Sequence, residues 1–292
     1  MFNAKVLADS TNTCDNRLTT MELTYPRFIH SEILTHRMFS RNAASSRAIP
    51  VEKMIEQVEK NPVIPIHWGK AQKGMQAYEV VSDTDSIYSH TEAEGSMVER
   101  DVYVSTRYMC EDRWRHMARC AVRAANTMSG YGLHKQIINR ILEPWMWITV
   151  IVTGNEGAWN NFFALRCHHE AEPHIQKIAG MAREVRSQSI PQKLSAGQWH
   201  LPLIGFEGDE LLSDEDKVKV SVGRNARISY LTHDGIRDVQ ADIDLHDRLL
   251  TSKHFSPFEH VARSGKHTGD GGNFGFGWTQ YRKTLKGEYQ ND

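Results

Sequence analysis

Residues 36–47 read HRMFSRNAASSR and form the densest polar stretch of the chain, where a helical pattern of apolar residues ends ahead of Pro50. Three arginines and three serines crowd into it. Arginine makes bidentate hydrogen bonds to anions, and serine hydroxyls and free backbone N–H groups add further donors. The composition therefore favours a site for phosphate or another anion. A solvated helix end capped by serines is the equal alternative.

In the rest of the chain, hydrophobic periodicity predicts long helices and a few strands. Alternating residues predict strands at 5–8 and 17–24, and a β-branched and aromatic run predicts a buried strand at 145–153. Helices are predicted at 28–39, 51–60, 98–128, 133–142, 159–166, 173–187, 218–228, 236–252 and 277–285. Because strands and helices do not alternate regularly, a doubly wound parallel sheet is not expected.

The composition is that of a globular protein without a strong charge bias. The 292 residues include 35 Lys and Arg against 36 Asp and Glu, which gives a formal net charge of −1. This balance argues against a nucleic-acid partner bound through a bulk positive field. No apolar run is long enough to span a bilayer, and the start lacks a secretory signal pattern. The four cysteines form no C-x-x-C pair, so we expect a cytoplasmic protein without a disulfide framework.

Fifteen histidines raise the question of a metal site. The densest cluster, residues 168–174, reads HHEAEPH and does not have the H-E-x-x-H spacing. The side chains of His168 and His169 would diverge by roughly 100° on a helix, which hinders binding to one ion. No metal site is therefore predicted, and a metal-dependent hydrolase stays a remote alternative.

The 36–47 stretch resembles the motif R-H-R-x-x-S-x-N-x-x-S-x-R-Y of the flavin-dependent thymidylate synthases. Six polar positions match in register: His36, Arg37, Ser40, Asn42, Ser45 and Arg47. Thr35 and Ala48 stand where the motif has Arg and Tyr. Two further windows agree. Residues 139–142, NRIL, resemble the family segment that sends an Arg to the nucleotide, and residues 161–166, NFFALR, resemble its N-x-x-x-L-R helix.

Two more family segments occur in an unexpected place. Residues 224–230, RNARISY, resemble R-x-A-R-V-S-[FY], and residues 254–260, HFSPFEH, resemble H-x-[ST]-P-F-E-H. In the family both precede the polar motif, whereas here both follow it, which implies a circularly permuted order. Gln280 and Arg282 resemble a Gln…Arg pair that in the family stands where this chain has Glu32 and Thr35. We expect one catalytic domain, 1–292, with an insertion at 62–95 and a glycine-rich tail with a terminal helix at 265–292.

The resemblance implies an α/β fold of the α+β type, with helices packed around a mostly antiparallel sheet, and a homotetramer with active sites between subunits. It implies reductive methylation of dUMP to dTMP, with FAD as cofactor and methylenetetrahydrofolate and NADPH as co-substrates. Arg166 would be catalytic, stabilising negative charge on the pyrimidine ring. The nucleotide-binding residues would be Arg37, Ser45, Arg47, Arg140, Arg166, Gln280 and Arg282. The flavin-binding residues would be His36, Ser40, Asn42, Asn161, Leu165, Ser229, His254, Ser256 and Glu259.

Departures from the family pattern leave alternatives open. Glu32, Thr35, Ala43 and Ala48 differ at positions expected to read the nucleotide or the flavin, and Glu170 stands where the family has His. The same fold would then act on another deoxypyrimidine nucleotide such as dCMP, or transfer hydroxymethyl instead of methyl. A non-catalytic nucleotide-binding protein is the more distant alternative.

Overall fold

The computed structural model describes residues 1–74, 77–84, 86–88, 103–230, 238–265, 272–286 and 288. A five-stranded sheet of order β3-β6-β2-β1-β7 forms its centre. The strands are β1 (Asn3–Thr11), β2 (Arg17–Pro26), β3 (Ser40–Ala43), β6 (Trp147–Asn155) and β7 (Gln192–Lys193). Every neighbouring pair is antiparallel except β1 and β7. The predicted fold class, helices around a mostly antiparallel sheet, is confirmed.

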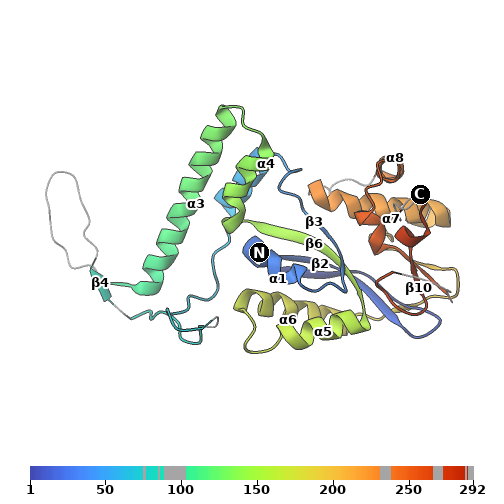
Figure 1. The fold of residues 1–292 in the computed structure, drawn as a ribbon, viewed down its shortest axis with the longest axis horizontal. Helices are drawn as coiled ribbons and strands as arrows, with labels where there is room; N and C mark the ends of the chain where they lie inside the picture. Colours follow the sequence, from blue (N-terminus) through green and yellow to red (C-terminus); the bar gives the residue numbers. More distant parts are fainter. Residues whose placement is uncertain are drawn as a thin grey trace.

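Strands β2 and β6 form the middle of the sheet and are paired from Leu18–Asn155 to Pro26–Trp147. Most of their residues are buried, because the sheet is covered on both faces. Figure 1 shows α5 (Glu156–Arg166) and α6 (Pro173–Gln188) along one face, and α7 (Asp214–Arg227) with the C-terminal segments on the other side. The strands predicted at 5–8, 17–24 and 145–153 are confirmed, with shifted ends.

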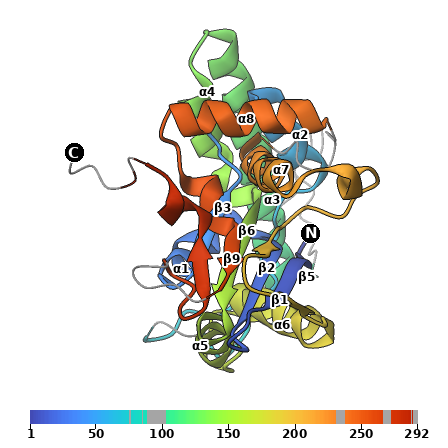
Figure 2. The same ribbon diagram turned by 90° about the vertical axis from the view of Figure 1, so that its right-hand side faces the viewer.

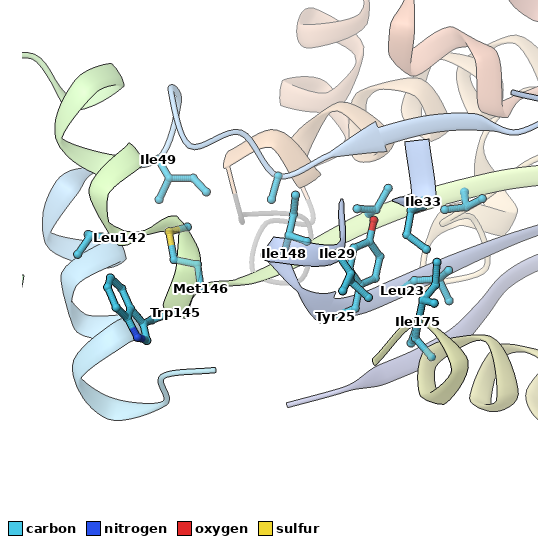
Figure 3. Close-up of a cluster of buried hydrophobic side chains, with 14 of the residues drawn as sticks. Leu23, Tyr25, Ile29, Ile33, Ile49, Leu142, Trp145, Met146, Ile148 and Ile175 are labelled. Atoms are coloured by element: carbon cyan, nitrogen blue, oxygen red, sulfur yellow. The ribbon is translucent and has the colours of Figure 1, made fainter. Parts of the chain in front are cut away.

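The main core lies between the sheet, α6 and the segment that leads into β6 (Figure 3). Leu23 and Tyr25 of β2 pack with Ile175 of α6, and each is at most 1% exposed. The same cluster continues to α2 (Val51–Lys60), whose apolar stripe faces inward as its periodicity predicts. Burial of these side chains is the main force that holds the helices to the sheet.

Helix α3 (Thr106–Gly130) packs against α2 and extends away from the sheet (Figure 1). It begins where the Ser105 hydroxyl accepts a hydrogen bond from the Tyr108 N–H. The prediction placed this helix at 98–128, of which residues 98–102 lie outside the described residues. After α3 come α4 (Lys135–Ile138) and a 3₁₀ segment, η2 (Asn139–Trp145). No helix in the described part of the chain is long and apolar enough to cross a membrane.

The helix predicted at 28–39 is wrong beyond residue 34. A 3₁₀ turn, η1 (Arg27–Ile29), leads into α1 (His30–Leu34), and a turn then precedes β3. The turn brings His36 and Phe39 into the interior, where both are buried. Tertiary burial thus outweighs the local helical spacing.

Helix α8 (Val239–Thr251) lies against α7 (Figure 2). Buried ion pairs hold both α8 and the loop before α7 to α7. Arg224 makes a bidentate pair with Asp209 at 2.6 and 2.8 Å. Asp242 of α8 accepts from Arg224 at 3.2 Å and from Arg227 at 2.6 Å. Gly223 permits the close approach, since a Cβ there would lie 2.3 Å from the Asp242 carbonyl oxygen.

The C-terminal end of the described chain builds a second, three-stranded sheet from β8 (Trp199–His200), β9 (Ala262–Ser264) and β10 (Trp278–Gln280). The helix predicted at 277–285 is therefore wrong at its start, and only a 3₁₀ turn, η6 (Tyr281–Thr284), follows the strand. Pairing with β9 and burial of Trp278 favour the strand. Residues 266–271, 287 and 289–292 of the predicted tail lie outside the described residues.

The predicted insertion, 62–95, is irregular over residues 62–74 and 77–84, with one isolated bridge between Gly69 and Val80. Strand β4 (Ser86–Tyr88) pairs with β5 (Tyr103–Ser105). Residues 75–76, 85 and 89–95 of the insertion lie outside the described residues.

Candidate functional site

The side chain of Arg166, at the C-terminal end of α5, is held by three groups of the segment before β3. Its Nε donates to His36 Nε2 at 2.9 Å, and one terminal nitrogen donates to Thr35 Oγ1 at 3.2 Å. The other terminal nitrogen lies 3.4 Å from Glu32 Oε2. Helix α5 is fixed at its start by Asn155, whose side chain accepts from the Ala158 N–H at 2.9 Å. These contacts fix both the plane of the guanidinium and the direction in which it points.

His36 is neutral in this arrangement. Burial, the Arg166 cation and then Arg41 lower its pKa from 6.5 to about 4. The ring packs edge-on against Phe162, with centroids 4.9 Å apart. Because Nε2 accepts from Arg166, Nδ1 carries the ring proton. The pKa of Glu32 is raised, first by burial and then by the nearby Glu172.

Arg166 lines two cavities. The smaller, about 160 Å³, is also lined by four residues predicted from the sequence: His36, Arg37, Asn161 and Leu165. The larger, about 740 Å³, is lined by Glu32 and Glu172 and by His67 and Tyr78 of the predicted insertion. The sequence therefore located the residues around Arg166 but not the insertion residues that complete the larger cavity.

A second group of predicted residues meets at β3. The amide of Gln280 donates to Ser40 Oγ at 2.8 Å and to the Glu259 carbonyl at 2.9 Å. Arg282 is paired with the Glu259 carboxylate. Segments from the C-terminal third of the chain thus contact β3.

Helix α7 reaches the same strand. Asn42 donates to the backbone oxygen of Asn225 at 2.8 Å, and the Ser45 N–H donates to the Ser229 carbonyl at 3.2 Å. Ser229 is half-buried, and so is Ser256, which begins η5 (Ser256–His260). His254, between α8 and η5, is exposed.

The predicted phosphate-binding residues are more scattered. Arg47 and Arg140 are exposed. The segments that carry them are tied together by Asn139, which donates to the carbonyls of Ser46 at 2.6 Å and Ile49 at 3.0 Å. Arg140 lines a separate surface cavity with Arg27, Phe28, His30, Ser31, Leu34, Glu143 and Pro144.

Comparison with protein families gives one match, which covers well over half of the chain. Residues 12–192 match the model described as thymidylate synthase complementing protein. The chain belongs to the flavin-dependent thymidylate synthase family. The matched range contains the 36–47 stretch and α5 but ends before residues 224–230 and 254–260, so the permuted order stays a prediction.

Several solved structures resemble this member of the family. A UMP/dUMP methylase from Streptomyces cacaoi with 5-Br dUMP is 16% identical, with a TM-score of 0.38, over 59% of this chain and 66% of that one. The same methylase with 5-Br UMP is 15% identical, with a TM-score of 0.41, over 64% and 89%. The Helicobacter pylori flavin-dependent thymidylate synthase with FAD and dUMP is 11% identical, with a TM-score of 0.39, over 58% and 67%. This chain thus spans slightly less than two thirds of the first of these chains. No curated protein sequence matches it.

Four further residues stand out in this family member. Glu32 and Thr35, seen only as departures from the motif, both contact Arg166. Asn225 and His260 are fully buried, and within the described part of the chain the Asn225 amide and His260 Nε2 have no hydrogen-bond partner. Buried polar atoms are rarely left unpaired. The unpaired atoms of Asn225 and His260 lie on segments that contact β3. They fit a polar cofactor such as a flavin nucleotide, which would supply hydrogen-bond partners.

His260 belongs to a buried chain of hydrogen bonds. Its Nδ1 lies 2.8 Å from Thr153 Oγ1, which lies 2.7 Å from Thr20 Oγ1. Thr20 is bonded in turn to His200, and His200 to Ser10. This chain links η5 to the central sheet and fixes the imidazole whose Nε2 is unpaired.

The histidine cluster at 168–174 does not form a metal centre in the described residues, where no group of three His, Cys, Asp or Glu side chains converges. His174 is buried, paired with Glu172, and its Nε2 accepts from the Ile66 N–H at 2.9 Å. These contacts anchor the start of the predicted insertion beside the larger cavity.

Proposed function

We propose that this chain catalyses the reductive methylation of dUMP to dTMP, with FAD as cofactor and methylenetetrahydrofolate and NADPH as co-substrates. Membership of the flavin-dependent thymidylate synthase family supports this reaction. The observation that carries the proposal is the Arg166 guanidinium, fixed by His36, Thr35 and Glu32 at the junction of two cavities.

Arg166 would bind the pyrimidine ring and stabilise the negative charge that develops on it. Arginine stays charged at every working pH and donates in a fixed plane, so a positioned guanidinium stabilises such charge without reorganisation. The neutral His36 orients Arg166 without adding a competing positive charge. Arg37, Ser45, Arg47 and Arg140 would hold the sugar and phosphate, as the motif predicts.

When bound, FAD supplies the electron-transfer chemistry that protein side chains lack. The chain's own residues would bind and orient it. Ser40, Asn42 and Ser229 lie at or beside β3, while Asn161 and Leu165 lie in the smaller cavity with His36. Ser256 and Glu259 lie on η5, and His254 just before it. The unpaired Asn225 amide and His260 Nε2 support a polar ligand at this place.

Self-association would complete the site, in keeping with the predicted homotetramer. Met38 and Leu165, which line the smaller Arg166 cavity, are 47% and 55% exposed. Apolar side chains gathered beside a polar site are typical of a surface that another protein covers. Sedimentation of the purified protein tests this, and a monomer at all concentrations contradicts it.

A single preparation tests the reaction. Purified protein should be yellow or bind added FAD, and should convert dUMP to dTMP with methylenetetrahydrofolate and NADPH, as identified by mass. Parallel incubation with dCMP, and a search for a hydroxymethyl product, distinguish the two related reactions. A colourless protein that binds no FAD would overturn the proposal.

A further inference from the structure

Glu32 lies beside Arg166 in the wall of the larger cavity, and sequence reasoning gave it no role. Its side chain is 37% exposed, against 22% for Arg166, so both reach the cavity while staying largely covered. One carboxylate oxygen, Oε2, lies 3.4 Å from the guanidinium. Within the described residues, the other oxygen, Oε1, has no hydrogen-bond partner.

The contacts of Arg166 leave part of its hydrogen-bonding capacity for a ligand. A guanidinium has five N–H groups, and three of them point to His36, Thr35 and Glu32. One N–H is therefore left on each terminal nitrogen. On the acceptor side, His36 Nε2 is occupied by Arg166, and Thr35 Oγ1 accepts from Arg166 while donating to the Glu32 carbonyl. Among the described residues that contact the guanidinium, Glu32 Oε1 is the acceptor atom without a partner.

We propose that Glu32 is the residue that selects uracil, by accepting a hydrogen bond from the ring N3–H while Arg166 donates to the neighbouring O4. The inference rests on the proposed function, in which Arg166 holds the pyrimidine. Uracil presents a donor at N3 beside an acceptor at O4, and the Glu32–Arg166 pair presents an acceptor beside donors.

Cytosine has the opposite pattern along this edge, with an acceptor at N3 and an amino donor at position 4. An ionised carboxylate only accepts, so placing Oε1 against the cytosine N3 brings two lone pairs together. A site built to hydrogen-bond one group discriminates strongly against an analogue that lacks it, because its own polar group is left unpaired. Glu32 thus makes the site selective for a pyrimidine that has an oxygen at position 4 and a hydrogen on N3.

The test compares ligands and variants in one binding experiment with the FAD-loaded protein. The ligands are dUMP, 3-methyl-dUMP, which lacks the N3–H, and dCMP. The variants are Glu32→Ala, Glu32→Gln and, as a matched control in the same cavity, Glu170→Gln. Titration calorimetry gives each dissociation constant, and circular dichroism verifies that each variant is folded.

Wild-type protein should bind dUMP about 10- to 100-fold more tightly than 3-methyl-dUMP, the range expected for a hydrogen bond to a charged group. Glu32→Ala should bring the two ligands to nearly equal affinity, and Glu32→Gln should keep part of the preference because its amide oxygen still accepts. Glu170→Gln should leave the preference unchanged.

Two results would overturn the inference, and the first of them leaves the proposed function intact. One is an unchanged preference in Glu32→Ala protein that still methylates dUMP. The other is tighter binding of dCMP than of dUMP by the wild-type protein, which would mean that Glu32 reads a 4-amino group. Absence of both dUMP binding and dUMP methylation would overturn the proposed function and this inference together.

Discussion

Arg166 Nε donates to His36 Nε2 across 2.9 Å, which joins the end of α5 to the segment before β3. The two residues stand 130 positions apart. The pKa of His36 is lowered to about 4, first by burial and then by Arg166 itself, so the ring stays an uncharged acceptor at neutral pH. The contact therefore orients the cation on which the proposed chemistry depends.

Replacing Arg166 with lysine tests that orientation. Arg166→Lys keeps the charge but loses the planar fork that contacts three partners, so dTMP formation should fall by about 100-fold, as for loss of one positioned donor in an active site. The melting temperature should change little. Arg183→Lys, on the exposed side of α6, is the matched control and should keep full activity. Full activity in Arg166→Lys would contradict the assigned role.

Gln280 should act as a positioning residue for β3. It is 2% exposed and donates to Ser40 and to the Glu259 carbonyl. Gln280→Ala should lower the free energy of unfolding by about 1–3 kcal/mol, because buried acceptors lose their donor. It should also weaken FAD binding. Gln240→Ala, at an exposed position of α8, is the control and should change neither the free energy of unfolding nor FAD binding. If Gln280→Ala also changes neither quantity, the prediction is refuted.

Stability should decline as the pH falls below about 6.5. The buried His200 and His260 have pKa values lowered by burial to about 3 from 6.5. Between pH 6.5 and about pH 3 the unfolded chain binds more protons than the folded chain. The stabilisation from the neutral histidines is therefore fully present above pH 6.5 and is lost as the pH falls toward 3. Each histidine contributes a slope of about 1.4 kcal/mol per pH unit. Urea unfolding at pH 7.5, 6 and 5 measures this decline.

A variant separates these histidines from other titrating groups. His200→Gln should unfold more easily at pH 7.5 but show a shallower loss between pH 6 and pH 5. His116→Gln, at an exposed position of α3, should keep the wild-type slope. A wild-type stability that is flat from pH 7.5 to pH 5 is the contrary result.

Two helical glycines should respond in opposite directions. Gly223→Ala would place a Cβ 2.3 Å from the Asp242 carbonyl oxygen, so α8 must move and the protein should lose about 1–3 kcal/mol. At Gly180 of α6, a Cβ would have no neighbouring atom within 4 Å, so Gly180→Ala should gain up to about 1 kcal/mol through helix propensity. Chemical denaturation measures the free energy of unfolding of both variants. Equal changes in the two variants would contradict the difference in packing around the two glycines.

Local patterns of residues predicted most helices and strands and part of the candidate site. Apolar periodicity predicted α2 at its observed bounds, because its buried stripe is a local property of spacing. The 36–47 motif and the N-x-x-x-L-R window named His36, Asn161, Leu165 and Arg166, which line one cavity. Such motifs are readable because their chemistry depends on residue types at short, fixed intervals.

Contacts between residues that are remote in sequence could be identified only in the folded chain. The contacts of Glu32 and Thr35 with Arg166 depend on a turn that replaces the predicted helix end, and that turn forms because His36 and Phe39 are buried. The strand at Trp278–Gln280 exists because β9 pairs with it. Likewise, the unpaired atoms of Asn225 and His260 became visible only once burial removed water from them. Burial and long-range pairing are properties of the folded chain, and no local pattern of residues carries them.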